Sequence, residues 1–329
     1  MNIKEKVFLP IKGFFTKEES ATKITLNKLD LADIFIALAP AVIFGSLIFG
    51  LRALLCLSIS VALAIGLDFL WNIIFKAKKR FSLESVIYGL VAGLTVSSKL
   101  NIWLLAAVNV VAFALRKTVF KQRKMLVATP WLLAKALFAG VFSTAFTTYA
   151  FPFIETTNGI LPVDGMLSAA GYTYPAKYLF FGVHSGNIGE TSALLLLIGG
   201  IYLILRKIIN PVIPVSFIIT STVLSLIFGE NIGLSLLGGG VIFAAFFLTL
   251  DYSFVSSAFY KKLLYGIACG IFTFILRLIF GAEMAYFAVI LANCVFLCVN
   301  RRNIKRFVRF VKKPDFKRLL NILKTAFSV

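Results

Sequence analysis

Apolar residues fill ten consecutive runs of this 329-residue chain, separated by charged clusters or by glycine and proline. The runs lie at about 31–50, 53–75, 84–98, 101–116, 130–150, 190–205, 212–228, 234–250, 263–280 and 284–300. Most approach the ~20 residues that an α-helix needs to cross the hydrocarbon core of a bilayer. Apolar residues make up 60% of the chain and charged residues 15%, whereas soluble proteins average about 25% charged residues. The sequence therefore predicts an all-α integral membrane protein with about ten transmembrane helices.

Lysine and arginine are concentrated in alternate connections between these runs. They are placed as six in 1–30, four in 76–80, five in 116–124, two in 206–207, two in 261–262 and ten after residue 300. Because positive charge accumulates on the cytoplasmic side of membrane proteins, these connections are expected there. We therefore expect a multi-pass protein of a prokaryotic inner membrane with both termini in the cytoplasm. The net charge of +20 then reflects membrane topology, and no nucleic-acid partner is expected.

Five runs precede the longest connection and five follow it. An odd number of helices in each half inverts one half relative to the other, as in inverted-repeat transporters. The expected organisation is a basic amphipathic segment at 1–30, a first five-helix repeat at 31–150, an extracytoplasmic loop at 151–189, a second repeat at 190–300 and a basic amphipathic tail at 301–329. The two basic segments are expected to lie on anionic lipid, and docking of a partner subunit is the alternative.

Ionisable residues within or beside the apolar runs are candidates for function, because a charge inside a bilayer is costly. The candidates for an ion or electron pathway are Glu84, Glu190, Asp251, Arg277 and Glu283. Glu84 and Glu190 each stand at the start of a run, where a carboxylate also stabilises a helix N-terminus, so capping is an alternative role. Asp33, Asp68 and Glu230 lie at run ends and are expected to be solvated.

Arg277 lies within the ninth run, between Phe274 and Phe280, and needs an anion, a cage of carbonyl groups or a cofactor phosphate. Glu283 is its nearest acidic neighbour in the sequence, and a structural Arg277–Glu283 pair is the simplest interpretation. The single histidine, His184, is expected to be a solvated loop residue. The sequence contains no HExxH, Walker or GxSxG motif and no paired cysteines, so no metal site is expected. From these residues alone, a transporter and an electron-transfer subunit are equally admissible.

Residues 182–207, GVHSGNIGETSALLLLIGGIYLILRK, resemble the RnfD/NqrB family. Its members are membrane subunits of Rnf-type and sodium-pumping, quinone-reducing flavin electron-transfer complexes. Asp251-Tyr252 and the last two apolar runs, with Arg277, Glu283 and Asn293, continue the resemblance. It implies two inverted five-helix repeats, the arrangement that the count of apolar runs also predicts.

The resemblance also implies a flavin, which family members attach through a phosphoester to a threonine in the outer loop. The corresponding position here is Ala170, at the end of the stretch 163–170. Alanine has no hydroxyl group, so covalent FMN is not expected. Thr173 is a weak alternative attachment site, and non-covalent riboflavin or FMN is the cofactor that we expect. The first half departs from the family pattern in the basic segment from Lys117 to Pro130.

The expected function is that of a membrane subunit of an Rnf-like electron-transfer complex that couples electron flow to Na⁺ or H⁺ movement. Such a chain would belong to an ion-translocating oxidoreductase and would not be catalytic alone. Its expected partners are other membrane and flavoprotein subunits. Two alternatives stay open, namely a transporter or channel without a redox centre and a structural anchor for a flavinylated partner.

Overall fold

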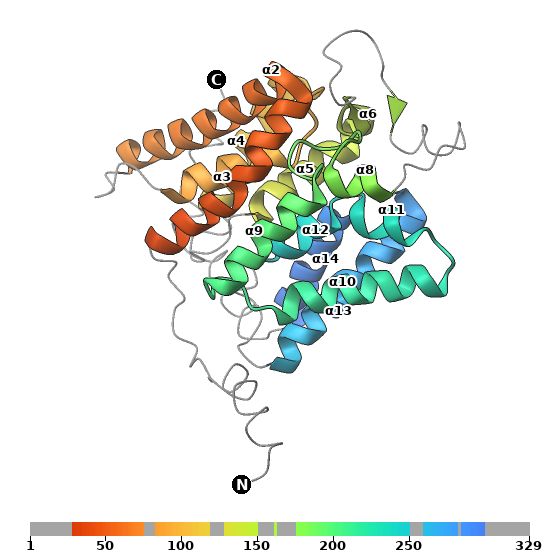
Figure 1. The fold of residues 1–329 in the computed structure, drawn as a ribbon. Helices are drawn as coiled ribbons and strands as arrows, with labels where there is room; N and C mark the ends of the chain where they lie inside the picture. The colour runs from red at the N-terminus through yellow and green to blue at the C-terminus, as the bar shows by residue number, and fades with distance from the viewer. Residues whose placement is uncertain are drawn as a thin grey trace.

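The computed structural model describes residues 28–75, 83–118, 128–150, 161–162, 176–250, 259–281 and 284–299. Within these ranges the chain is mostly helical, as predicted (Figure 1). Ala170, Thr173, Asp251 and Glu283 lie outside the described residues, as do the tail 301–329 and all but the last three residues of the segment 1–30.

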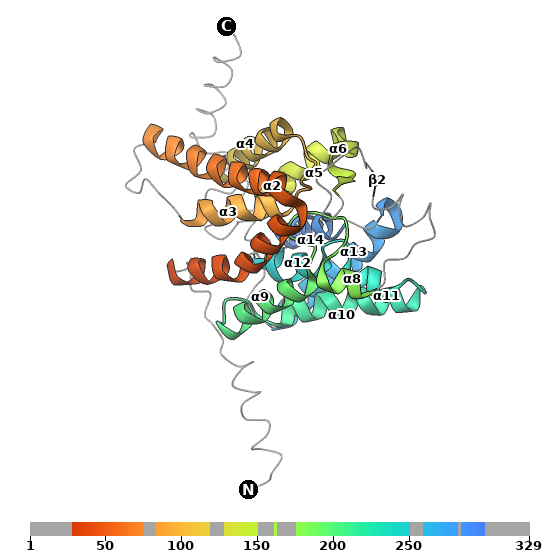
Figure 2. The ribbon, with the colours of Figure 1, turned by 45° about the horizontal axis from the view of Figure 1, so that its top comes forward.

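Helix α2, Lys28–Ile74, contains the first two apolar runs without a loop between them. A straight helix of 47 residues would be ~70 Å long, more than twice the ~30 Å of a bilayer core. Gly50 divides it, because its backbone is non-helical at φ 71° and ψ −162°, a conformation that favours glycine. Two arms meet there at a sharp corner, visible in red and orange in Figures 1 and 2.

The second arm of α2 packs closely against α3, Leu83–Leu94. A Cβ atom at Gly89 would lie 2.6 Å from the Val61 Cα, and one at Gly93 would lie 2.9 Å from a Leu57 side-chain atom. The two glycines therefore let the helix backbones approach each other, as small residues do in membrane helix pairs. The first half continues with α4 at Ile102–Thr118, α5 at Thr129–Val141, α6 at Ser143–Thr147 and β1 at Thr148–Tyr149.

The strand β1 pairs antiparallel with β2, Leu161–Pro162. The helices that follow are α8 at Ala176–Phe181, α9 at Ala193–Leu205, α10 at Val212–Ile227, α11 at Ile232–Leu237, α12 at Val241–Phe243, the π-helix η1 at Ala244–Leu248, α13 at Phe259–Phe280 and α14 at Ala285–Val299. The eighth apolar run, 234–250, is thus several short pieces. Gly239 and Gly240 turn the chain between α11 and α12 with positive φ values of 59° and 67°.

Two described stretches of helix, Asp30–Ile74 and Phe259–Phe280, are long and apolar enough to cross a membrane, and five other apolar helices are shorter. Large apolar side chains cover much of the surface. Trp103, Val141 and Leu205 are 83%, 75% and 75% exposed. The interior is apolar as well, and Trp131 and Tyr286 are among the largest side chains that are fully buried. An apolar exterior around an apolar core suits lipid as the solvent.

Candidate functional site

The segment 182–192 passes through the interior of the protein, although six of its side chains are polar. His184, Ser185, Asn187, Glu190, Thr191 and Ser192 are all at most 5% exposed. The backbone N–H of Ile188 donates to the Val96 carbonyl at 3.0 Å, and that of Gly189 donates to the Leu94 carbonyl at 2.8 Å. These bonds join the segment to the end of α3, so residues 182–189, the last part of the predicted outer loop, belong to the interior packing.

Glycine allows this segment to lie directly against α2 and α3. A Cβ atom at Gly45 in α2 would overlap the Ile188 carbonyl oxygen. A Cβ atom at Gly189 would lie 2.5 Å from the Leu94 Cβ. Neither position has room for a side chain, which explains why glycine stands at both.

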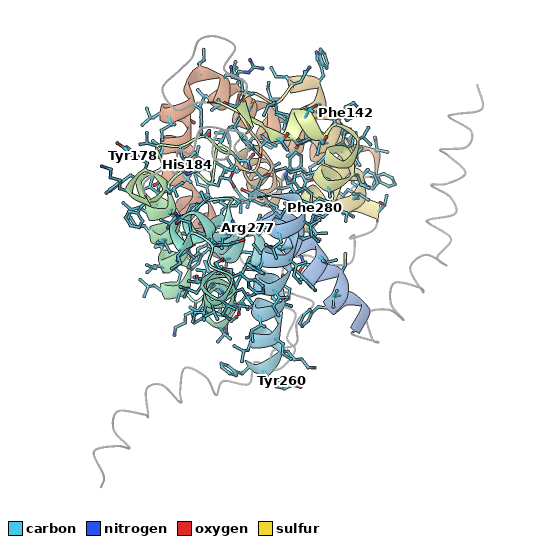
Figure 3. The ribbon with its side chains drawn as sticks, turned by 90° about the vertical axis from the view of Figure 1, so that its right-hand side faces the viewer. Phe142, Tyr178, His184, Tyr260, Arg277 and Phe280 are labelled. Carbon is cyan, nitrogen blue, oxygen red and sulfur yellow. The ribbon has the colours of Figure 1, made fainter. Side chains whose placement is uncertain are left out.

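His184 is buried, so the expectation of a solvated residue is wrong. Its Nδ1 lies 2.9 Å from the Ser185 carbonyl oxygen, and its Nε2 lies 2.9 Å from the Thr191 carbonyl oxygen. The ring therefore ties the two ends of the polar segment together. In Figure 3, His184 lies well inside the outline of the protein, while Tyr260 lies at its lower edge.

Glu190 is the acidic side chain of this segment and is 3% exposed. Its Oε1 accepts from the backbone N–H and the side-chain amide of Asn187, at 2.9 and 2.8 Å. Its Oε2 accepts from the Tyr286 hydroxyl group of α14. It does not cap α9, because Ser192 does so by accepting from the Leu195 N–H at 3.4 Å. Among the described residues, no cationic side chain forms an ion pair with Glu190.

Lys135, in the middle of α5, also contacts Tyr286 and is 4% exposed. Its Nζ lies 4.6 Å from the centroid of the Tyr286 ring and donates to the Thr95 carbonyl oxygen. Lys135 lies within the fifth apolar run, 130–150, but is not among the pathway residues predicted from the sequence. The signal was available, because a lysine within a membrane span is itself a candidate for function.

Arg277 occupies a cage of oxygen atoms near the Phe280 end of α13 (Figure 3). Its Nη1 donates to the carbonyl oxygen of Ser235 and to its Oγ, the latter at 3.2 Å, and its Nη2 donates to the Gly238 carbonyl oxygen at 2.9 Å. The carbonyl groups at the end of α11 thus receive hydrogen bonds from a side chain, a common way to satisfy a helix terminus. The pairing of Arg277 with Glu283 stays a prediction.

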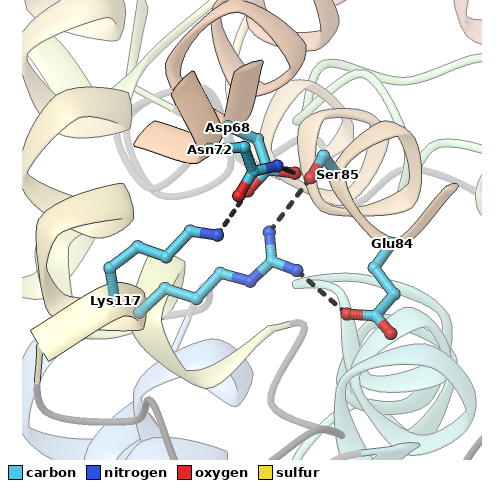
Figure 4. Close-up of polar contacts among 6 residues, drawn as sticks. Asp68, Asn72, Glu84, Ser85 and Lys117 are labelled. Carbon is cyan, nitrogen blue, oxygen red and sulfur yellow. Dashed lines mark hydrogen bonds and ion pairs between the residues drawn. The ribbon is translucent and has the colours of Figure 1, made fainter. Parts of the chain in front are cut away.

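Glu84 stands apart from the Glu190 segment, at the opposite end of α3. Its Oε2 forms an ion pair with Arg116 Nη2 at 3.3 Å, and Arg116 Nη1 donates to Ser85 at 3.5 Å (Figure 4). Beside it, Lys117 forms an ion pair with Asp68. These contacts hold the ends of α2, α3 and α4 together.

Asp33 and Asp68 are 7% and 4% exposed, so the expectation that they are solvated is wrong. Each forms an ion pair with a cationic side chain that is remote in the sequence, Arg206 for Asp33 and Lys117 for Asp68. Within the described ranges, no three His, Cys, Asp or Glu side chains gather into a potential metal site.

Comparison with known proteins identifies the family. The profile of the NQR2, RnfD, RnfE family matches residues 19–308. The chain is 29% identical, over 82% of its own length and 87% of the relative's, to the D-type subunit of the Na⁺-translocating ferredoxin:NAD⁺ oxidoreductase complex of Acetobacterium woodii. It is 26% identical, over 84% and 88% of the two lengths, to the D-type subunit of the proton-translocating ferredoxin:NAD⁺ oxidoreductase complex of Clostridium ljungdahlii. The resemblance found in the sequence is confirmed, and the chain belongs to the NQR2, RnfD, RnfE family.

Proposed function

We propose that this protein is the D-type membrane subunit of an Rnf-like, flavin-dependent electron-transfer complex that couples electron flow to Na⁺ or H⁺ movement. The family match over residues 19–308 carries this proposal. Two relatives also support the proposal, because they are named as D-type subunits of complexes that translocate Na⁺ or protons. The partners would be the other membrane subunits and the flavoprotein subunits of the same complex.

Glu190 is the residue that we propose for ion coupling among the described candidates. A coupled ion pathway needs a charge whose attraction for a cation changes when a nearby centre is reduced, and such an effect is strong where the dielectric constant is low. Glu190 is buried, and its hydrogen-bond donors are Asn187 and Tyr286. Asp251 and Glu283 remain proposed pathway residues on sequence grounds. The ion pair of Glu84 and the carbonyl cage of Arg277 favour structural roles for those two.

The proposed topology has ten spans in two inverted five-helix repeats in a prokaryotic inner membrane, with both termini in the cytoplasm. Its support is the distribution of positive charge, which includes Arg116 and Lys117 at the end of α4 and Arg206 just after α9. Reporter fusions at the two termini test it. Periplasmic activity of a reporter at either end would overturn the topology.

A flavin bound through a phosphoester does not fit position 170, because Ala170 offers no hydroxyl oxygen. We therefore propose that any flavin of this subunit is held non-covalently. The test is the visible absorption spectrum of the purified protein before and after acid precipitation. Yellow colour released into the supernatant supports non-covalent flavin. A peptide covering 163–175 that carries the added mass of FMN would overturn the proposal.

The function is tested in proteoliposomes that contain the purified complex. We expect ion uptake driven by reduced ferredoxin and NAD⁺, lost when this subunit is deleted and restored by the wild-type gene. Glu190→Gln should lower ion uptake by about tenfold, the rate equivalent of ~1.4 kcal/mol. Glu230→Gln is the control, because Glu230 is partly exposed and accepts from the Ser225 hydroxyl group at 3.3 Å, and uptake should stay near the wild-type rate. Ion flux through the isolated chain without electron donors would instead identify a transporter or channel. Unchanged ion uptake by the complex from the deletion strain would overturn a role in ion coupling and leave only an anchoring role.

A further inference from the structure

Two opposite buried charges contact the same tyrosine, Lys135 at the face of its ring and Glu190 at its hydroxyl group. Lys135 reaches the face of the Tyr286 ring from α5, with 4.6 Å between Nζ and the ring centroid. The Tyr286 hydroxyl group donates to the Glu190 carboxylate. All three side chains are at most 4% exposed. We propose that Lys135 is the counter-charge of Glu190 and acts on it through Tyr286.

Tyr286 can transmit the influence of the Lys135 charge to Glu190, because both of its contacts shift electron density in the tyrosine towards Lys135. The face of an aromatic ring is electron-rich and attracts an ammonium group. An ammonium group that draws electron density towards itself makes the hydroxyl group a stronger donor, and hydrogen bonds in a low dielectric polarise one another. A stronger donor stabilises the charged form of Glu190. The positive charge of Lys135 therefore favours the negative charge of Glu190 without direct contact.

The surrounding structure keeps the two charges in this arrangement. The Thr95 carbonyl oxygen accepts from Lys135, and Asn187 holds the other carboxylate oxygen of Glu190. A Cβ atom at Gly240 would overlap Glu190 Oε2 and lie 2.7 Å from the Tyr286 hydroxyl oxygen. The backbone of Gly240 thus closes that side of the site. An isolated charge in such surroundings is strongly unfavourable, whereas two compensating charges are tolerated.

The pairing has a consequence for ion binding that rests on the proposed function of Glu190. A cation that binds to this carboxylate does so against the positive charge of Lys135. Lys135 therefore lowers the affinity of the site for the transported cation, and a neutral side chain at this position should raise it.

The charge pairing is tested first by thermal unfolding of the full-length protein in lipid nanodiscs. Lys135→Met and Glu190→Gln should each lower the unfolding temperature, because each removes one member of a compensating pair of buried charges. The double variant K135M/E190Q should regain most of the temperature lost by K135M. The control is D68N/K135M, because Asp68 is paired with Lys117. The decrease in unfolding temperature of this double variant should equal the sum of the decreases of the two single variants.

The inference would be overturned if the decrease in unfolding temperature of K135M/E190Q equalled the sum of the decreases of the two single variants. If K135M alone gives no folded protein, recovery of folded protein in the double variant supports the pairing, and failure to recover overturns it. Lys135→Arg keeps the positive charge and should lie closer to wild type than K135M.

The effect on ion binding is tested with the complex in proteoliposomes. K135M should lower the ion concentration that gives half-maximal uptake several-fold, whatever its effect on the maximal rate. An unchanged half-saturating concentration would overturn the role of Lys135 in ion binding. A wild-type complex without any ion uptake would overturn the proposed function instead, and the thermal experiment would still decide the charge pairing.

Discussion

Asp33 and Arg206, 173 residues apart, join the first arm of α2 to the end of α9. Asp33 Oδ2 lies 2.9 Å from both Nε and Nη2 of Arg206, and Oδ1 accepts from the Tyr202 hydroxyl group at 2.7 Å. A planar guanidinium group that presents two donors to one carboxylate makes a directional contact. The ion pair therefore connects the two halves of the chain at a defined point.

Asp33→Asn should lower the unfolding temperature, because Arg206 loses its anion and Tyr202 loses a charged acceptor. The Arg206 side chain is 52% exposed, so salt screens part of the attraction, and the difference from wild type should shrink at high ionic strength. Differential scanning fluorimetry at low and high salt measures both effects. An equal loss at both salt concentrations would show that the electrostatic contribution is negligible.

Gly89→Ala should force the second arm of α2 away from α3. The new methyl group would meet the Val61 Cα at 2.6 Å and the Ser60 carbonyl oxygen at 2.9 Å, and overpacking of this kind costs about 1–3 kcal/mol. Gly66→Ala is the matched control, because Gly66 also lies in a helix and a Cβ atom there meets nothing within 4 Å. Chemical denaturation in mixed micelles should show a lower free energy of unfolding for Gly89→Ala and no decrease for Gly66→Ala.

Gly240→Ala should disturb the Glu190 site as well as the backbone. Alanine at a left-handed position costs about 1–2 kcal/mol by itself, and at Gly240 its methyl group would also meet Glu190 Oε2 and the Tyr286 hydroxyl oxygen. Gly229→Ala isolates the backbone cost, because Gly229 has a φ of 73° and a Cβ atom there meets nothing within 4 Å. We expect Gly240→Ala to be the more destabilising in the same unfolding assay. Equal losses of stability for the two variants would mean that the Glu190 and Tyr286 side chains can move away from the new methyl group at no cost.

Asn293→Leu should weaken the contact between α5, α13 and α14. Asn293 is fully buried, its Oδ1 accepts from the Tyr265 hydroxyl group, and its Nδ2 donates to Thr129 Oγ1 at 3.0 Å. Each of these hydrogen bonds contributes about 0.5–1.5 kcal/mol. Tyr265→Phe removes only one of them and should cost about half as much. A loss for Asn293→Leu no larger than that for Tyr265→Phe would show that the bond to Thr129 contributes nothing.

The positions of most helices could be predicted because hydrophobic runs and charge clusters are local properties of the chain. The corner at Gly50 could not, because the run boundary at 50–53 looks like a short connection and only the backbone conformation shows one bent helix. The break at Gly238–Gly240 was visible as a glycine cluster, but the π-helix after it depends on packing around Ala244–Leu248.

The interior position of residues 182–189 could not be predicted, because polar residues between two apolar runs ordinarily face water. Here the segment is held in the interior by residues that are remote in the sequence. Its backbone donates to Leu94 and Val96, and Glu190 accepts from Tyr286. The contact of Lys135 with Tyr286 could not be predicted for the same reason, because Tyr286 lies in the other half of the chain. A buried charge can be noticed in a sequence, but its counter-charge is found only when the helices are in place.

The bend at Gly50 sets the rotational phase of everything that follows it in α2. Since successive residues of an α-helix are offset by ~100°, inserting or deleting one residue at this corner would turn the second arm by that angle. Leu57 and Val61 would then point away from the glycines of α3 that now receive them. Chain length at a single surface corner is thus constrained by a helix contact that begins two turns further along.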